Sequence, residues 1–123
     1  MRAYEDSDYE TIKSWWELRG DKAPSNLVLS DDGLIIEGVA ASWLYTGNST
    51  MALIGWPVVN PKVGCLTAMR ALEQILREQA KFARVQGCLV VSAYTNAPAL
   101  LKLMDKIGFR RGDDTVTNMI LGV

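Results

Sequence analysis

A long amphipathic helix enclosed by two apolar strands is the feature of this sequence that most constrains its fold. The segment before the helix, MALIGWPVV (51–59), and the segment after it, CLVVSAYT (88–95), have the composition of buried strands. A strand–helix–strand unit within one sheet is almost always a right-handed crossover. We therefore expect two parallel strands with the helix on one face of the sheet. The expected helix, residues 60–86, repeats apolar side chains along one face: Leu66, Met69, Leu72, Leu76 and Ala83.

Shorter strand segments precede this unit. Residues 33–38 and 39–46 have strand composition and are bounded by glycine-containing turns. The short gaps between them predict an antiparallel meander that runs into the strand at residues 51–59. Residues 2–5 could pair with the meander as a first strand.

A helix is expected near the N-terminus. Residues 6–20 carry acidic side chains in the first turn, and Tyr9, Ile12 and Trp16 share one apolar stripe. Residues 21–32 are polar and contain a proline, which predicts mostly loop.

The C-terminal part is expected to contain a short helix and two strands. The helix covers residues 97–107 and ends at Gly108. Residues 109–110 are expected to begin a strand, residues 112–114 to turn, and residues 115–123 to form a terminal strand.

Length and composition describe one globular domain over residues 1–123. The element order predicts class α/β (α+β), with a mixed central sheet and helices on both faces. The net charge of -1 and the lack of a long basic run argue against nucleic-acid partners. There is no histidine, and Cys65 and Cys88 have neither metal-ligand nor disulfide-framework spacing, so no metal site is expected. No apolar run reaches membrane-spanning length and the N-terminus lacks a signal peptide's apolar stretch, so we expect a cytoplasmic protein with no membrane partner.

Gly55 and Pro57 interrupt the strand that leads into the long helix. Proline has no N–H to donate, so the strand ladder must break there at a bulge or an edge. The free edge could hydrogen-bond an extended, amide-bearing ligand. The helix N-terminus follows at once, and its free N–H groups suit a diphosphate.

Two stretches resemble the GNAT (Gcn5-related) N-acetyltransferase superfamily. One is LIGWPVV followed by NPKVGCLTAMRALEQIL; the other, more specific, is VVSAYTNAPALLKLMDKIGF, where an apolar strand, an asparagine and a short helix end in Gly-Phe. The resemblance covers nearly the whole chain in order and spacing. It implies the GNAT acyl-CoA N-acyltransferase fold, with acetyl-CoA as acyl-donor cosubstrate in a wedge where the fourth and fifth strands splay apart. The length and the Trp-Trp pair also resemble small, divergent GNAT-like proteins of bacteriophages, which would work in the host cytoplasm.

The family's diphosphate loop has the pattern Gln/Arg-x-x-Gly-x-Gly/Ala, which PKVGCL matches only in part. Gly64 fits the first glycine, whereas Leu66 replaces the second small residue and Pro61 replaces the Gln/Arg. The resemblance implies cofactor contacts at seven positions: Val58, Lys62, Val63, Gly64, Cys65, Thr67 and Asn96.

The same residues also have a purely structural interpretation. Asn60 followed by Pro61 is typical of a helix start, and Gly64 would then merely begin the helix. Asn96 would cap the next helix, with Pro98 in its first turn. Both interpretations are compatible with the sequence.

The catalytic acid implied by the resemblance is missing. The family usually places a tyrosine five residues before the phenylalanine of Gly-Phe to protonate the departing thiolate, and Met104 stands there. A thioether has no proton to give. Asp105 is adjacent but points about 100° away around the helix. Tyr94 and Ser92 are the nearest hydroxyl candidates, and Tyr94 is the catalytic residue we predict.

A general base is not evident either. Enzymes of the family often carry a glutamate on the fourth strand or use a water relay, but MALIGWPVV contains no carboxylate. The available substitutes are Glu37, Asp31, Asp32 and ordered water. Acyl transfer can still run on proximity and oxyanion stabilisation. The loss of acid catalysis would slow it by about 10² to 10⁴-fold rather than abolish it.

Four tryptophans are many for this length. Trp16 fits the core, whereas Trp15 lies off the apolar stripe. The resemblance implies that Trp15, Tyr45 and Trp56 line the acceptor site, where aromatic rings favour an apolar or cationic acceptor. Packing alone is the alternative for all the tryptophans.

Three functions follow as hypotheses. The first is an acyl-CoA-dependent N-acyltransferase that transfers acetyl to a primary amine of a small molecule or protein. The second is a catalytically weak or inactive GNAT-fold protein that binds CoA or a partner protein. The third is a homodimer that exchanges its terminal strand, residues 115–123, with no ligand at all.

Overall fold

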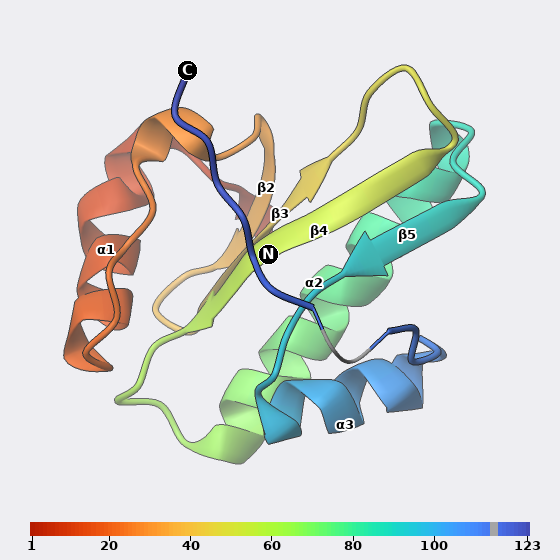
Figure 1. The fold of residues 1–123 in the computed structure, drawn as a ribbon. Coiled ribbons are helices and arrows are strands. Elements are labelled where there is room, and N and C mark those ends of the chain that lie inside the picture. Colours follow the sequence, from red (N-terminus) through yellow and green to blue (C-terminus); the bar gives the residue numbers. More distant parts are fainter. Residues whose placement is uncertain (114–115) are drawn as a thin grey trace.

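Five strands form one sheet in the order β1-β2-β3-β4-β5 in the computed structural model, which describes residues 1–113 and 116–123 (Figure 1). The strands are β1 (Arg2–Ala3), β2 (Asp32–Ile36), β3 (Ala40–Tyr45), β4 (Met51–Val59) and β5 (Val90–Ala93). The helices are α1 (Tyr9–Leu18), α2 (Cys65–Val85) and α3 (Pro98–Ile107), with single 3-10 turns at η1 (Asp6–Asp8) and η2 (Asn26–Val28).

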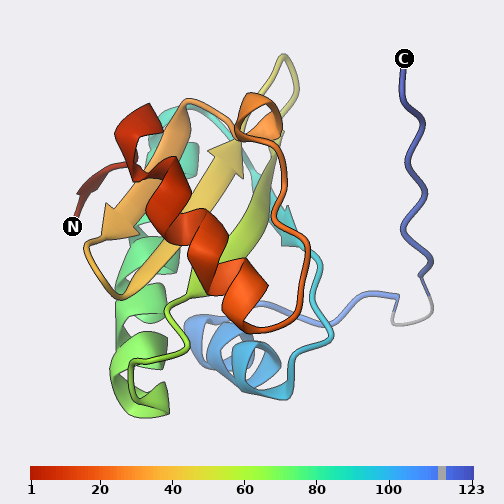
Figure 2. The ribbon, with the colours of Figure 1, turned by 90° about the vertical axis from the view of Figure 1, so that its left-hand side faces the viewer.

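The sheet is mixed, as the sequence predicts. Strands β1 to β4 pair antiparallel, whereas β4 and β5 pair parallel across the α2 crossover. Helix α1 covers one face, and α2 with α3 covers the other (Figures 1 and 2). The expectation of helices on both faces of one mixed sheet is therefore confirmed. In the described part of the chain no helix is both long and apolar enough to cross a membrane.

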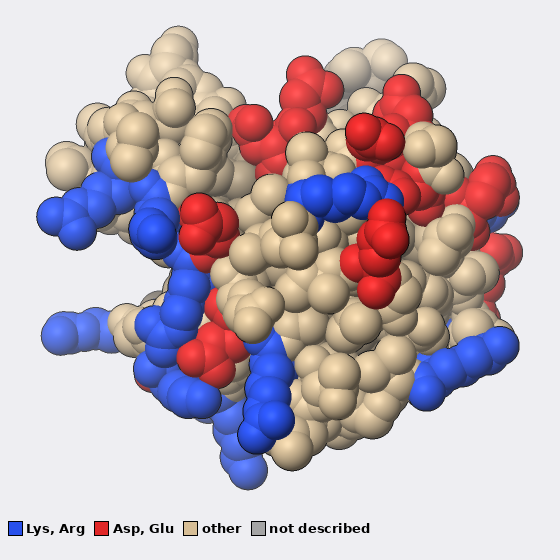
Figure 3. All heavy atoms as spheres, turned by 180° about the vertical axis from the view of Figure 1, so that it is seen from behind, with Lys and Arg blue, Asp and Glu red and all other residues tan. Residues whose placement is uncertain are grey.

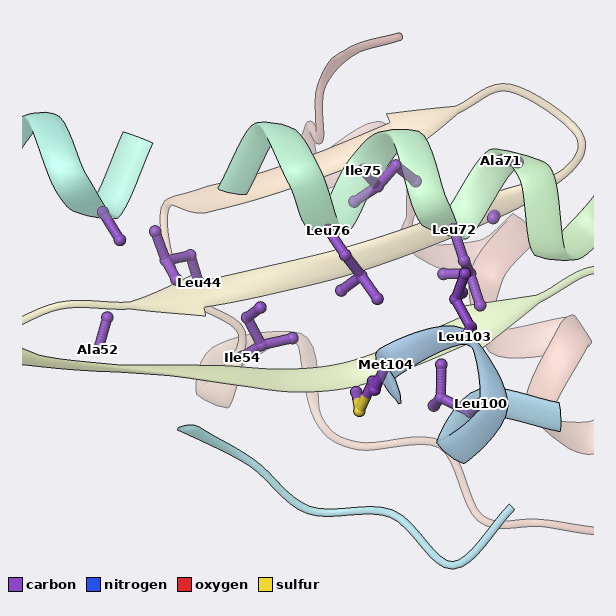
Figure 4. Packing of buried hydrophobic residues seen from close by; sticks show 12 residues of the cluster. Leu44, Ala52, Ile54, Ala71, Leu72, Ile75, Leu76, Leu100, Leu103 and Met104 are labelled. Carbon is purple, nitrogen blue, oxygen red and sulfur yellow. The ribbon is translucent and has the colours of Figure 1, made fainter. Parts of the chain in front are cut away.

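The core between the sheet and α2 is built mainly from leucine, isoleucine and alanine (Figure 4). Its members, here called the α2-side core, include Leu44, Ala52, Ile54, Ala71, Leu72, Ile75, Leu76, Leu100, Leu103 and Met104. Leu66 was expected on this face but is 65% exposed, because it lies about 120° around the helix from Leu72, whereas Ala68 in the same turn is buried. Helix α2 begins at Cys65 rather than Asn60, because residues 61–63 form a turn in which the Val63 N–H donates to the Asn60 carbonyl at 3.1 Å.

The core under α1 is aromatic. Trp43 contributes its indole from β3, stacked 6.2 Å from Trp16 and edge-on to Tyr4 at 4.9 Å between ring centroids. Trp15 is only 3% exposed, so the expectation that it lies off the buried stripe is wrong. The reason is the width of the stripe, because positions three and four residues after Ile12 both face the sheet. We call this group, with Ile35, Ala41 and Val58, the α1-side core.

The two strands expected at the C-terminus are not formed in residues 109–113 and 116–123. The N–H of Phe109 is used to close α3, since it donates to the Met104 carbonyl at 2.9 Å across the left-handed Gly108 (φ 117°). Residues 116–123 run apart from the sheet and helices (Figure 2) and so have no strand to pair with. Part of the expected turn at 112–114 and the first residue of the expected terminal strand lie outside the described residues.

Candidate functional site

A β-bulge in β4 creates the site. Across β3, Ala41 pairs with Val58 but Trp43 pairs with Gly55, so β4 carries one extra residue in between. Trp56 occupies this bulge with a positive φ of 59°, a conformation that costs a bulky residue about 1–3 kcal/mol. The Gly-Trp-Pro sequence predicts a break in the strand ladder, and in the structure this break is a bulge.

The bulge reverses which face each β4 side chain points to. Before it, Ala52 and Ile54 lie in the α2-side core; after it, Val58 lies in the α1-side core. A regular strand would keep residues an even number apart on one face. The bulge therefore increases the local twist of β4 between Gly55 and Val58.

The pairing between β4 and β5 ends next to this bulge. Their parallel pairing runs from Met51 opposite Val90 to Ile54 opposite Ala93 and ends there. β4 continues to Val59, so its remaining backbone has no strand partner on the β5 side among the described residues. Figure 1 shows the two strands diverging toward the N-terminal end of α2. This is the geometry of the splayed wedge expected from the sequence.

The N-terminus of α2 lies beyond the end of β4. Gly64 is its N-cap and Ala68 donates to the Gly64 carbonyl at 3.0 Å. The N–H groups of the three residues after Gly64 precede the first intrahelical bond and remain available, as at any uncapped helix start. A Cβ added at Gly64 would meet no atom within 4 Å, so the space next to the N-cap is open. An oxyanion would fit this space, with α2 contributing its positive dipole end.

Asn60 shapes the loop that carries these groups. Its side-chain amide donates to the Gly38 carbonyl at 2.9 Å, and its Oδ1 accepts from the Lys62 N–H at 3.0 Å. Its own carbonyl accepts from the Val63 N–H at 3.1 Å. Asn60 therefore connects the loop before α2 to the β2–β3 turn. From the sequence, its side chain was expected only to cap the helix.

Most of the expected cofactor residues gather at this helix start. Lys62, Gly64, Cys65 and Thr67 are exposed there and Val63 is half-buried. Val58 does not join them, because the bulge turns its side chain into the α1-side core.

The structural interpretation of two asparagines is corrected by the structure. Asn96 was expected as an alternative to cap α3, but Ala97 is the N-cap, with its carbonyl accepting from the Leu101 N–H at 3.0 Å. Asn60 likewise does not cap α2, since Gly64 does. The exposed Asn96 side chain lies between the end of β5 and the start of α3, so it remains available for contacts with a ligand.

Tyr45 and Trp56 form an aromatic wall beside the bulge. The Tyr45 ring covers Gly55, where an added Cβ would come within 2.9 Å of Cε2. The Tyr45 hydroxyl donates to the Val28 carbonyl at 2.7 Å. Burial raises the pKa of Tyr45, and hydrogen bonding with the Trp56 side chain and the Ser30 backbone opposes this in part. The phenol of Tyr45 therefore stays protonated beside Gly55. Trp15, the third expected member, is buried elsewhere under α1.

The acid and base candidates are dispersed. Tyr94 is 69% exposed just after β5, so its hydroxyl is free to move in solvent. Met104 is 5% exposed and reaches from α3 into the α2-side core near Ile54 (Figure 4). Asp105 is exposed and pairs with Arg111 at 3.3 Å. Glu37 is held at 2.8 Å by Arg2.

Asp31 and Asp32 line a different part of the molecule. They border a hollow of about 220 Å³ between β2 and α2, opposite Glu78. In the part of the chain that the structure describes, no group of three or more acidic or cysteine side chains is arranged to hold a metal ion.

An ion-pair network fixes α3 against α2. Glu73 accepts from Arg77 at 3.0 Å on its own helix and from Lys106 of α3 at 2.9 Å. The hydrogen bond from Lys106 is the main reason why the pKa of Glu73 is lowered, with that from Arg77 adding to it. Figure 3 shows basic side chains as a band over this face and acidic ones gathered on the neighbouring part of the surface.

Solved acetyltransferases have the same fold. An acetyltransferase from Trypanosoma brucei is 14% identical, with 97% of each chain covered and a TM-score of 0.67. A Thermus thermophilus protein is 15% identical over 99% of this chain and 97% of that chain, with a TM-score of 0.71. An aminoglycoside N-acetyltransferase in complex with CoA is 12% identical, with 98% of each chain covered and a TM-score of 0.63.

These similarities establish the fold of the chain as that of the GNAT acetyltransferases. No protein-family model matches the sequence, and no curated protein matches it significantly. The comparisons therefore show the fold of the chain, and the geometry of the site carries the inference about its activity.

Proposed function

We propose that this chain is an acyl-CoA-dependent N-acyltransferase that transfers acetyl to a primary amine. The observation that carries the proposal is the coincidence of three features: the end of β4–β5 pairing after Ile54, the bulge at Trp56, and the open N-terminus of α2 at Gly64. An extended ligand with amide groups and a diphosphate fits all three. Acetyl-CoA is such a ligand and would supply the activated acyl group.

Different parts of the chain would bind different parts of the acyl donor. The β5-facing backbone of β4 beyond Ile54 would pair with amide groups of the donor. The N–H groups that follow Gly64 would bind the diphosphate, and the exposed Lys62 would add a positive charge beside it. Asn96 would contact the donor from the opposite side of the wedge.

The protein would act mainly by aligning the acceptor amine with the thioester, and less by activating either group with an acid or a base. Met104 offers no proton at the position of the usual acid. Of the candidate bases, Glu37 is paired with Arg2, and Asp31 and Asp32 line the hollow between β2 and α2. An amine that arrives neutral can attack a thioester without a protein base, and the thiolate is a moderately good leaving group because free thiols have a pKa of about 8.5. Proximity would therefore supply most of the rate enhancement. Tyr94 would be the proton donor if one is used.

The acceptor would enter past the wall of Tyr45 and Trp56. Aromatic faces favour a cationic or apolar group. A primary amine on an apolar body fits this wall, and a small molecule or a protein side chain could each present one. We propose the cytoplasm as its place of action.

The alternative is a weak or inactive GNAT-fold protein that binds CoA without turning it over. Met104 favours this alternative, because its buried thioether replaces the family's acid. The bacteriophage origin implied by the Trp-Trp helix would suit either function and stays a prediction.

Calorimetry separates these functions from a protein without a ligand. Titration with CoA and with acetyl-CoA should give saturable binding with a dissociation constant below about 1 mM, which corresponds to about -4 kcal/mol. The absence of binding at that concentration would rule out both the transferase and the CoA-binding module.

A further inference from the structure

We propose that the hollow between β2 and α2 binds a small primary alkylammonium ion, that is, a positively charged amino group on a short apolar stem. The hollow lies along the C-terminal half of α2, where Gln79 forms part of its wall. The distance along the helix axis from Gly64 to Gln79 is about 22 Å, at about 1.5 Å per residue. The hollow is therefore separate from the wedge, and the inference does not depend on the proposed function.

A buried hydrogen-bond acceptor without a partner belongs to the wall of the hollow. Gln79 is 1% exposed and lies on the face of α2 that packs against the sheet. Its Nε2 donates to the Ser42 carbonyl of β3 at 2.9 Å, whereas its Oε1 has no partner among the described residues. Buried polar groups are nearly always hydrogen-bonded, because their lost hydration is otherwise not replaced. An N–H donor held in the hollow against the Gln79 side chain would complete the hydrogen bonding of this amide.

The charge around the hollow favours a cation. Asp31, Asp32 and Glu78 line it, and no lysine or arginine of the described chain does. Neither aspartate carboxylate is in an ion pair with a described residue, and Glu78 meets only Lys81 at 3.8 Å, with both side chains exposed. Figure 3 shows acidic side chains gathered on part of the face that carries α2. Carboxylates without a counter-charge around a hollow attract a positively charged ligand and bind it through charge-assisted hydrogen bonds.

The walls between these charges are apolar, which favours an organic cation over a metal ion. Leu34, Leu44 and Phe82 line the hollow. Within the described ranges, no three acidic or cysteine side chains are arranged to hold a metal ion. The volume of the hollow, about 220 Å³, is below the range of about 300–1,000 Å³ that is typical for drug-sized ligands. A short alkyl stem would therefore fill the apolar part, and its ammonium group would bind to Gln79 and the carboxylates.

Three probes with the same butyl stem separate charge from hydrogen bonding. n-Butylammonium has a positive charge and three N–H donors, n-butyltrimethylammonium has the charge without a donor, and 1-butanol has one donor without the charge. In NMR titrations of the ¹⁵N-labelled full chain, n-butylammonium should bind saturably with a dissociation constant below about 10 mM. It should shift the side-chain amide of Gln79 and the backbone amide of Asp32. The other two probes should bind about tenfold more weakly or less. Equal affinity for either of them, or no saturation with n-butylammonium, would overturn the proposal.

Two variants locate the binding site. Gln79→Met replaces the amide by an apolar group of similar size, and Asp32→Asn removes one charge from the rim. Each should weaken n-butylammonium binding by about fivefold or more. Asp32→Asn changes an exposed side chain, so it provides the test even if Gln79→Met does not fold. Glu17→Gln removes an exposed carboxylate from α1 and should leave the affinity unchanged.

The same titrations distinguish the hollow from the acceptor side of the wedge. The indole N–H of Trp56 reports on the aromatic wall, and it should not shift at concentrations of n-butylammonium that saturate the Gln79 resonances. Shifts confined to Trp56 and its neighbours would place the amine at the wedge and would overturn the proposal. Unchanged affinity in either variant, where that variant is folded, would do the same.

Discussion

The ring of Tyr45 lies over Gly55 so closely that a methyl group added at Gly55 would come within 2.9 Å of the ring carbon Cε2. The hydroxyl of Tyr45 is fixed at the other end by the Val28 carbonyl. The glycine in β4 is therefore required by the aromatic wall beside the bulge, and the pair lies on the side of the bulge where we propose that the acceptor enters.

Gly55→Ala should lower the free energy of unfolding by about 1–3 kcal/mol, because the ring is held and cannot easily retreat. Denaturant unfolding measures the change. Gly47→Ala is the matched control, since no atom lies within 4 Å of a Cβ there. In a Tyr45→Ser background the cost of Gly55→Ala should vanish; an undiminished cost would show that the ring is not its cause.

Gly64→Val should separate binding from stability. The backbone at Gly64 (φ -59°, ψ 144°) suits any residue, and no atom lies within 4 Å of an added Cβ, so the free energy of unfolding should fall by no more than about 1 kcal/mol, the scale of a less favourable N-cap residue. The branched side chain would occupy the space in front of the α2 N–H groups and weaken CoA binding by about tenfold or more in calorimetry. CoA binding that survives unchanged would place the diphosphate elsewhere.

Replacement of Met104 tests the missing acid. Met104→Tyr introduces a hydroxyl where the family's acid stands, and Met104→Phe introduces the same ring without it. Both should cost stability in this tightly packed position, by about 1–3 kcal/mol. If proton delivery limits the reaction, the tyrosine variant should transfer acetyl about 10-fold or more faster than the phenylalanine variant. Equal rates would show that the leaving thiolate needs no proton from this helix.

Asp8 should make stability depend on pH in the acid range. The Asp8 carboxylate accepts from Arg2 at 2.7 and 2.9 Å and from the Glu5 N–H at 2.9 Å, and the hydrogen bond from Arg2 is the main reason why its pKa is lowered. A carboxyl group with a lower pKa in the folded state stabilises the protein above its unfolded-state pKa, and this contribution is lost as the pH falls through the folded-state value.

Asp8→Asn should therefore destabilise the protein at pH 7, and the difference from the unmodified protein should shrink below about pH 4. Urea unfolding at a series of pH values measures this. Glu17→Gln, which removes an exposed carboxylate from the end of α1, is the control and should show little change. A destabilisation that does not vary with pH would mean that the Asp8 charge is not its source.

The parts of the fold that follow from local pattern and chain connectivity could be predicted from sequence. The apolar strands around residues 60–86 were enough to predict the parallel crossover, and the Gly-Trp-Pro break located the wedge. The burial of Trp15 was predicted wrongly because the apolar stripe of a helix is wide enough to include residues both three and four positions after Ile12. The face of Val58 was missed because one extra residue in a strand reverses the alternation after it.

The expected C-terminal strand shows a different limit of prediction from sequence. Residues 116–123 have strand composition, yet a strand exists only with a neighbour, and nothing local says whether that neighbour is in the same chain. The role of Asn60 was also beyond local pattern, because its partner at Gly38 is 22 residues away. Catalytic assignments depend on such long-range contacts, so Tyr94 stays a prediction.

Release of free thiol from acetyl-CoA in the presence of a panel of primary amines is the most direct test of the proposed activity. A transferase should release thiol in a way that depends on both the protein and an amine, saturates with acetyl-CoA, and falls by about tenfold or more with Gly64→Val at subsaturating acetyl-CoA. Saturable CoA binding without amine-dependent release across aliphatic, aromatic and peptide amines would contradict the transferase and leave the CoA-binding module.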